Sequence, residues 1–248
     1  MKKVLVTGAS GGIGKAICLY FIEKGWQVFG TDIVSSELEH NNFKFYLADI
    51  STTQNIKELV SKIEQETKSL DALVNNAAIQ ISKPFSEITE QDWDETMNLN
   101  LKSVFFLTQK MVSLLRQSQG SVVNIASVHA IATSKNISAY AISKSAIVGL
   151  TKSLAIELAE DNIRVNSVLP AAIDTPMLRS GLRRGHLFSE DDEGLLKELG
   201  QKHVLGRVGS TEEVAKAAYF LADNTQSSFV TGTSFVLDGG ATIKLSTE

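Results

Sequence analysis

A tyrosine and a lysine four residues apart, Tyr140 and Lys144, are the residues of this sequence best suited to moving a proton. On a helix this spacing places both side chains on one face, about 5–6 Å apart at their bases. Tyrosine is a poor base at its free pKa of about 10, but a neighbouring ammonium favours the tyrosinate and moves that pKa toward working pH. The pair therefore predicts general acid–base chemistry, as alcohol oxidation or carbonyl reduction requires.

The same spacing recurs at Tyr20 and Lys24, so the position of each pair must separate them. Tyr140 follows Ser127, at the end of a predicted strand, by 13 residues. Tyr20 and Lys24 fall near the end of the first predicted helix, away from the strand ends where open α/β sheets bind ligands. We therefore expect Tyr140–Lys144 to be functional and Tyr20–Lys24 to be structural.

A glycine-rich string, TGASGGIG at residues 7–14, lies between the first predicted strand and the first predicted helix. Glycines at this place let the backbone turn tightly and approach a pyrophosphate, while the helix N-terminus offers free N–H groups and a positive dipole. The string alone is a weak signal, but its placement in the first strand–helix unit is typical of dinucleotide binding.

The second predicted strand is followed by Asp32, 24 residues after Gly8. That offset is close to the roughly 20 residues expected of an acid that binds the adenosine ribose. A carboxylate here accepts hydrogen bonds from both ribose hydroxyls and repels the additional phosphate of NADP. Positions 9–11 hold no lysine or arginine to receive that phosphate. The sequence therefore predicts NAD as the cofactor.

The elements that position these residues alternate between short apolar runs and longer segments of helical period. The predicted strands are Val4–Thr7, Gln27–Thr31, Phe43–Ala48, Ala72–Asn75, Ser121–Ala126, Arg164–Leu169 and Ser234–Leu237. The predicted helices are Ile13–Glu23, Gln54–Glu66, Gln91–Leu115, Ala139–Glu160 and Glu212–Ala222. This alternation predicts an α/β fold: a Rossmann-type, doubly wound parallel sheet of about seven strands, covered by helices on both faces. Residues 176–207 form the long irregular segment, which we expect to be a substrate loop or lid.

Composition limits the class of protein. The chain has 248 residues with a net charge of −4, which disfavours nucleic-acid binding and binding to an anionic membrane. Its single cysteine, Cys18, excludes an internal disulfide and a cysteine-rich zinc site, and no histidine spacing predicts a metal. The N-terminus lacks a signal-peptide pattern, and no apolar run approaches the roughly 18–20 residues of a membrane span. We expect one domain, residues 1–248, in the cytoplasm.

Several motifs in the same order make the chain resemble the short-chain dehydrogenase/reductase family from Val4 to Gly240. The family pattern TGxxxGxG matches Thr7, Gly8, Gly12 and Gly14, and its YxxxK pair matches Tyr140 and Lys144. Residues 75–78 match NNAG with alanine in place of the final glycine, and residues 170–175 match PGxxxT with alanine in place of the glycine. The first departure adds one methyl group at a crowded turn.

The resemblance implies particular site residues. The catalytic set comprises Asn100, Ser127, Tyr140 and Lys144. The cofactor contacts comprise Gly8, Ser10, Gly12, Ile13, Gly14, Asp32, Asp49, Ile50, Asn76, Tyr140, Lys144, Ile173 and Thr175. Asp49 and Ile50 are the implied adenine contacts, whereas Ile173 and Thr175 are implied to hold the nicotinamide carboxamide. No catalytic metal is implied.

The resemblance also implies roles. Tyr140 takes the alcohol proton in oxidation and returns it in reduction, and Ser127 hydrogen-bonds the substrate oxygen. Lys144 lowers the pKa of Tyr140 and holds the nicotinamide ribose, while Asn100 supports a water that links Lys144 to solvent. The family usually forms symmetric tetramers, so a homotetramer is expected.

The sequence leaves the substrate open. His129 could line the pocket and bind a second hydroxyl of a polyol or sugar. Arg179, Arg183 and Arg184 could hold a hydroxy or keto acid, although a solvated loop before a helix with acidic residues at its N-terminus explains them more simply. Two other functions stay open: an NADP-dependent 3-oxoacyl reductase, which shares every catalytic motif, and a non-catalytic regulator that senses NAD.

Overall fold

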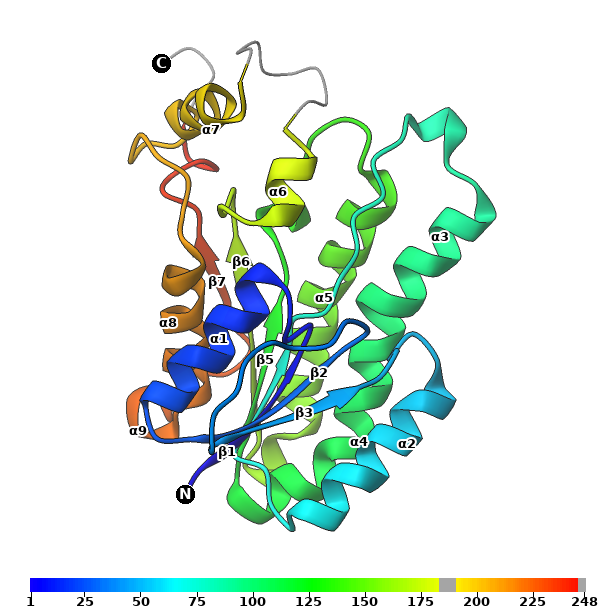
Figure 1. Cartoon of the computed structure of the whole chain (residues 1–248), viewed down its shortest axis with the longest axis vertical. Coiled ribbons are helices and arrows are strands. Elements are labelled where there is room, and N and C mark those ends of the chain that lie inside the picture. The colour runs from blue at the N-terminus through cyan, green and yellow to red at the C-terminus, as the bar shows by residue number, and fades with distance from the viewer. Residues whose placement is uncertain (183–190, 245–248) are drawn as a thin grey trace.

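The computed structural model describes residues 1–182 and 191–244, and within them the chain forms one seven-stranded parallel sheet with helices on both faces (Figure 1). The strands are β1 (Lys3–Thr7), β2 (Gln27–Asp32), β3 (Phe43–Leu47), β4 (Ala72–Asn75), β5 (Ser121–Ile125), β6 (Arg164–Pro170) and β7 (Ser234–Leu237). Their order is β3-β2-β1-β4-β5-β6-β7. Strands β2 and β3 are therefore added on one side of β1, and strands β4 to β7 on the other side. The expected doubly wound fold is confirmed, and β1 and β4 flank the switch point where such sheets bind ligands.

Burial separates the central strands from the edge strands. Every residue of β4, β5 and β6 is buried, because helices cover both faces of the sheet there. The expectation of full burial is wrong for β3 and β7, which are partly exposed and have a neighbouring strand on one side alone. Leu47 on β3 and Val236 on β7 are 63% and 41% exposed.

The helices divide into two layers, because successive side chains of each strand point to opposite faces of the sheet. Val4 and Val6 of β1 pack with α1 (Gly12–Glu23) and α8 (Thr211–Ala222). Cys18 of α1 is fully buried in that layer. Leu5 packs on the other face with α2 (Thr53–Glu66) and α4 (Ser103–Ser118). Figure 1 shows α1 beside α8 on one face, with α2, α4 and α5 (Ser138–Glu157) on the other.

The long helix predicted over Gln91–Leu115 is interrupted. The structure has α3 (Glu90–Met97), a five-residue π-helical turn (Asn98–Lys102), and then α4. The sequence pattern does not reveal such a turn, because the buried residues on either side of it, Thr96, Asn100 and Val104, keep the four-residue spacing of an α-helix. Turns of this kind are rare and often lie at functional sites, and this one contains Asn100.

The segment predicted to be irregular, residues 176–207, also differs from expectation. It contains α6 (Pro176–Ser180) and α7 (Asp192–Gln201), although residues 183–190 lie outside the described part. The leucines of these helices pack mainly on one another, in a small cluster formed by Leu182, Leu195 and Leu196 with Leu178, Leu199 and Val208. The segment therefore has its own apolar core beside the main sheet.

The start of helix α8 is set by local capping. Ser210 begins α8 by accepting a hydrogen bond from the backbone N–H of Glu213, whose carboxylate accepts one from the Ser210 N–H. This capping box satisfies two N–H groups at the helix start. Helix α5 ends at Glu157, three residues before the predicted end, and a short 3₁₀ turn (Ala159–Asp161) leads to β6. Helix α9 (Asn224–Ser227) is a single short turn after α8.

Candidate active site

The glycine turn between β1 and α1 brings the backbone of the two elements into direct contact. Gly8 has a φ of +66°, a conformation that favours glycine. A Cβ atom at Gly14 would lie 1.9 Å from the Gly8 carbonyl oxygen, so no side chain fits there. Ser10 and Ile13 belong to the same turn and the start of α1. The residues present therefore fit a pyrophosphate, which needs close backbone approach and the N–H groups of a helix start.

Asp32 lies at the end of β2, directly beside this turn. Its Oδ2 accepts a hydrogen bond of 3.0 Å from the backbone N–H of Ser10, and its Oδ1 accepts one of 2.7 Å from the N–H of Ile33. The carboxylate is thus held at the mouth of the glycine turn, where the ribose nearest a bound pyrophosphate would lie.

The proposed adenine contacts follow β3, the strand beside β2. The carboxylate of Asp49 accepts from the N–H of Ser51 at 2.9 Å, and its carbonyl accepts from the Asn55 side chain at 2.8 Å. Ile50 is buried. Asp49 and Asp32 therefore end neighbouring strands, on the same edge of the sheet as the glycine turn.

Asn76 joins the loop after β4 to the glycine turn. Its side-chain amide donates to the carbonyl oxygens of Thr7 at 2.9 Å and Gly8 at 3.2 Å. Its backbone N–H and that of Ala77 both donate to the Thr7 hydroxyl. Asn76 therefore supports the glycine turn in this structure.

Ser127 lies just beyond β5, and the side chain of Lys144 reaches the end of the same strand from α5. The Lys144 ammonium donates to the carbonyl oxygen of Ile125 at 2.8 Å and lies 5.6 Å from the centroid of the Tyr140 ring. Burial lowers the pKa of Lys144 from 10.5 to about 8. The Ser127 hydroxyl accepts from the N–H of His129 at 3.2 Å. The ring of His129 meets that of Tyr140 edge-on, with centroids 6.1 Å apart. β5, the 3₁₀ turn Val128–Ala130 and α5 thus bring these residues together.

Asn100 reaches the same helix from the π-helical turn. Its side-chain amide donates to the carbonyl oxygen of Ile79 at 2.9 Å and to the Ser143 hydroxyl at 3.1 Å. Ser143 in turn donates to the carbonyl oxygen of Tyr140 at 2.7 Å. Both amide hydrogens of Asn100 are therefore used, and its Oδ1 accepts from the N–H of Ile79 at 2.9 Å. The side chain has no hydrogen left to donate to a relay water, but the second lone pair of Oδ1 can accept a hydrogen bond from one.

Ile173 and Thr175 lie beyond the end of β6, opposite the glycine turn. Ile173 forms an isolated parallel bridge with Gly209, and the N–H of Asp174 donates to the Gly209 carbonyl at 3.0 Å. The Thr175 side chain lies 3.1 Å from the position that a Cβ atom of Gly12 would take. The segment expected to hold the nicotinamide thus closes against the glycine turn.

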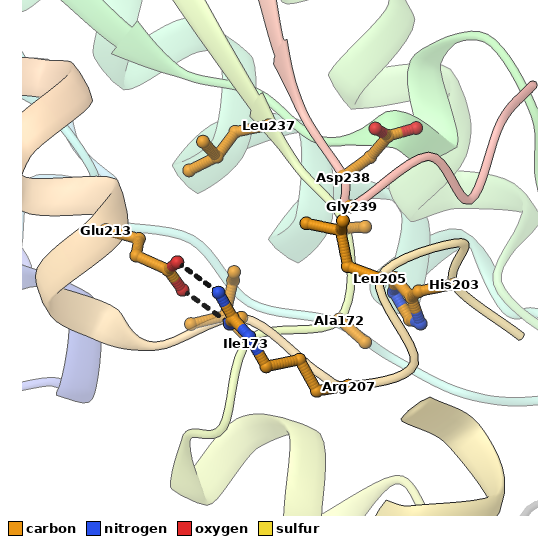
Figure 2. Close-up of a pocket in the computed structure, with 11 residues that line it drawn as sticks. Ala172, Ile173, His203, Leu205, Arg207, Glu213, Leu237, Asp238 and Gly239 are labelled. Atoms are coloured by element: carbon orange, nitrogen blue, oxygen red, sulfur yellow. Dashed lines mark hydrogen bonds and ion pairs between the residues drawn. The ribbon is translucent and has the colours of Figure 1, made fainter. Parts of the chain in front are cut away.

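A small cavity lies behind that segment (Figure 2). Its lining includes Ile173, His203, Leu205 and the ion pair of Arg207 with Glu213. His203 is buried, and its Nδ1 lies 3.0 Å from the Leu199 carbonyl oxygen. Since a carbonyl oxygen only accepts hydrogen bonds, Nδ1 carries the proton. The cavity belongs to the base of the α6–α7 segment and contains none of the predicted catalytic residues.

The charged residues of that segment agree with the simpler of the two expectations. Arg179 forms ion pairs with Asp174 at 2.7 Å and Glu193 at 2.9 Å, so its charge is already matched. Asp191 caps α7, and Asp192 and Glu193 occupy its first turn. Arg183 and Arg184, which were singled out in the sequence, lie outside the described residues.

The second tyrosine–lysine pair has the structural environment that was expected. The Lys24 ammonium lies 4.8 Å from the centroid of the Tyr20 ring and forms an ion pair with Glu23. The Tyr20 ring packs edge-on against Tyr219 of α8. This pair lies at the far end of α1 from the glycine turn.

Sequence reasoning missed a buried network that supports the site. Asn75 at the end of β4 donates to Asn124 Oδ1 at 2.9 Å, and Asn124 donates to the Thr151 hydroxyl of α5 at 3.0 Å. The signal was a polar residue in each of two strands that are otherwise apolar. Ser143 was also missed, although it directly precedes Lys144.

Two features are absent from residues 1–182 and 191–244. No group of three or more histidine, cysteine, aspartate or glutamate side chains in this part could hold a metal ion. No helix in it is long and apolar enough to cross a membrane.

Known proteins are similar to this chain over nearly its whole length. A family model described as enoyl-(acyl carrier protein) reductase matches residues 8–242. The 3-oxoacyl-[acyl-carrier-protein] reductase FabG of Thermotoga maritima is 38% identical, over 98% of both chains. The ligand-free aldohexose dehydrogenase of Thermoplasma acidophilum is 35% identical, with a TM-score of 0.92 over 99% of this chain and 95% of the other. A 4-hydroxyisoleucine dehydrogenase complexed with NADH is 30% identical, with a TM-score of 0.88 over 99% of this chain and all of the other.

Proposed function

The chain belongs to the short-chain dehydrogenase/reductase family, and from that premise we propose that it transfers a hydride between NAD(H) and an alcohol or carbonyl group of a small substrate. The observation that carries the proposal is the meeting of two sites at one edge of the sheet. The Lys144 ammonium lies beside the Tyr140 ring at the end of β5, and Asp32 stands at the glycine turn after β1.

The side chains of α5 and β5 supply the proton chemistry. A bound nicotinamide dinucleotide supplies the carbon that accepts or donates the hydride. In oxidation the Tyr140 oxygen accepts the proton of the substrate hydroxyl, and in reduction it returns a proton to the carbonyl oxygen. The Ser127 hydroxyl donates a hydrogen bond to that oxygen, where charge changes during the reaction.

Lys144 makes this proton transfer feasible at neutral pH. A pKa of about 8 keeps most of its side chain protonated at pH 7, so the ammonium favours the tyrosinate form of Tyr140. One hydrogen of the ammonium bonds the Ile125 carbonyl, which leaves the others for the nicotinamide ribose. Asn100 accepts the hydrogen bond of a relay water, which gives the proton a route to solvent.

Asp32 favours NAD over NADP. Its carboxylate accepts hydrogen bonds from ribose hydroxyls and repels a 2′-phosphate, and the turn at residues 9–11 carries no basic side chain to offset that repulsion. The similar 4-hydroxyisoleucine dehydrogenase, complexed with NADH, supports this choice.

The substrate we propose is a neutral, hydroxylated molecule such as a sugar or polyol. The ring of His129 stands beside that of Tyr140, where it can bind a second hydroxyl. Arg179 is already paired with two carboxylates, so it does not favour an acidic substrate. The similarity to an aldohexose dehydrogenase points the same way.

We further propose a homotetramer in the cytoplasm. Partly exposed apolar side chains on the edge strand β7, Phe235 and Val236, offer a surface for association. A single, buried cysteine suits a reducing compartment.

The deciding experiment measures NAD⁺ reduction by absorbance over a panel of sugars, polyols, hydroxy acids and secondary alcohols, with NADP⁺ in parallel. Turnover with NAD⁺ that disappears in Tyr140→Phe, while calorimetry shows unchanged NADH binding, supports the proposal. Full activity of Tyr140→Phe excludes the role of this tyrosine. NADH binding without turnover of any compound would instead favour a regulator that senses NAD.

A 3-oxoacyl reductase is the second candidate, favoured by the 38% identity to the Thermotoga maritima protein. It predicts reduction of a 3-oxoacyl thioester in preference to every sugar, and tighter binding of NADPH than of NADH. The same titrations and panel, extended by such a thioester, distinguish the two candidates.

A further inference from the structure

Ser10 connects the glycine turn to the loop after β2 through two hydrogen bonds. Its backbone N–H donates to Oδ2 of Asp32 at 3.0 Å. Its hydroxyl donates to the carbonyl oxygen of Val34 at 2.8 Å. One residue of the pyrophosphate turn thus holds both the ribose-binding carboxylate and the backbone two residues beyond it.

The second oxygen of Asp32 is held from its own loop. Oδ1 accepts from the N–H of Ile33 at 2.7 Å and, at a longer 3.4 Å, from the N–H of Val34. Both carboxylate oxygens therefore have backbone donors, which fix the direction of the lone pairs that remain for a ligand. The hydrogen bond from the Ser10 hydroxyl to the Val34 carbonyl ties this loop, with its carboxylate, to the glycine turn.

The loop is exposed and has little else to hold it at this point. The side chains of Ile33 and Val34 are 64% and 60% exposed, so neither is anchored in the core. Their apolar surfaces lie next to Asp32, where they can cover an adenine ring. Without the Ser10 hydroxyl, the loop could move away from the glycine turn and carry the carboxylate with it.

We propose that Ser10 is a positioning residue that sets the selectivity for NAD(H) over NADP(H) by holding Asp32 and Val34 against the glycine turn. This inference rests on the proposed function. A 2′-phosphate would have to enter between the turn and the loop, where it would meet the Asp32 carboxylate and the Val34 carbonyl oxygen. Both are electron-rich and neither can donate a hydrogen bond to a phosphate. The hydrogen bond from Ser10 keeps them in that place.

The test is Ser10→Ala, which removes the hydroxyl and keeps the backbone bond to Asp32. Dissociation constants for NADH and NADPH are measured by calorimetry. We expect NADH to bind about three- to tenfold more weakly, as for the loss of one hydrogen bond, with a smaller effect on NADPH. The NADH/NADPH affinity ratio should therefore fall, and Ser10→Thr, which keeps a hydroxyl, should restore it.

Two comparison variants separate positioning from general damage to the loop. Ile33→Ala removes apolar surface offered to adenine, which both cofactors share, so it should weaken both equally and leave the ratio unchanged. Ser36→Ala removes a hydroxyl of the same loop that accepts from the N–H of Leu38, away from the glycine turn, so it should change neither constant.

The outcomes are distinct. An equal loss for both cofactors in Ser10→Ala means that the hydroxyl contacts the shared part of the cofactor or merely stabilises the fold, and it overturns the inference. Unchanged affinity for both cofactors overturns it as well. If the wild-type protein itself binds NADPH more tightly than NADH, the proposed cofactor is wrong and this inference fails with it.

Discussion

The buried charge of Lys144 serves catalysis but lowers the stability of the folded protein. Its ammonium is almost completely buried and hydrogen-bonds one carbonyl oxygen, that of Ile125. No carboxylate contributes to its lowered pKa, so burial penalises the charge that catalysis needs. Active sites often carry such a local cost in stability.

Replacing this lysine by methionine should therefore abolish activity and stabilise the protein at neutral pH. The folded protein binds the Lys144 proton more weakly than the unfolded chain does, with pKa values of about 8 and 10.5. The stability lost through Lys144 is thus constant below pH 8 and is recovered as the pH rises to about 10.5. Lys144→Met should raise the unfolding free energy by up to about 3 kcal/mol at pH 7 and by much less near pH 10.5.

Denaturant unfolding of both proteins at several pH values measures this difference. The lost hydrogen bond to Ile125 lowers the gain equally at every pH, so the pH dependence is the informative quantity. A stability difference that does not change between pH 7 and pH 10 would contradict the prediction. Lys152→Met, an exposed lysine of the same helix, is the control.

At the scale of elements, the glycine turn and the π-helical turn show two ways in which backbone geometry builds a site. In the glycine turn, missing side chains allow β1 and α1 to approach. In the π-helical turn, one additional residue places Asn100 where it bonds Ile79 and the Ser143 hydroxyl. The first has a sequence signature, whereas the second has none that periodicity can reveal.

The glycine turn predicts a contrast between two substitutions. In Gly14→Ala the new Cβ would lie 1.9 Å from the Gly8 oxygen, so the turn must open and NADH affinity should fall at least tenfold. In Gly11→Ala the nearest atom is 3.4 Å away and φ is −74°, so affinity should stay within about twofold. Calorimetric titration with NADH, with circular dichroism as the check on folding, compares them; equal affinities would contradict the steric argument.

At the scale of the whole molecule, the two sheet edges differ in what they expose. Edge β7 carries Phe235 and Val236, both partly exposed. Edge β3 carries Lys44 and the exposed Leu47. A proposed tetramer that uses the β7 edge predicts that the two edges respond differently to a new charge.

Val236→Lys should lower the molar mass in solution, measured by light scattering after size-exclusion chromatography. Leu47→Lys, the matched change on the opposite edge, should leave it unchanged. If both variants keep the wild-type mass, the β7 edge is not part of the interface. A monomeric wild-type protein would overturn the tetramer itself.

The whole-molecule view also explains which features the sequence predicts. Strand positions follow from apolar runs, and the doubly wound parallel sheet follows from the alternation of strands with helices, so residues 32, 127 and 140 could be placed at one sheet edge in advance. The π-helical turn and the helices within residues 176–207 could not, because tertiary contacts rather than local pattern decide them. The α7 helix, for example, depends on packing of Leu195 and Leu196 against Leu182.

Cys18, the single thiol of the chain, can report local opening of the folded protein. It is fully buried in the middle of α1, and burial raises its pKa to about 12. A thiol reagent can therefore reach it only during the moments when α1 lifts from the sheet. Because α1 also begins the glycine turn, a dinucleotide held there should make such excursions rarer in proportion to its occupancy. The rate at which Cys18 is labelled therefore measures cofactor binding, and this measurement needs no known substrate.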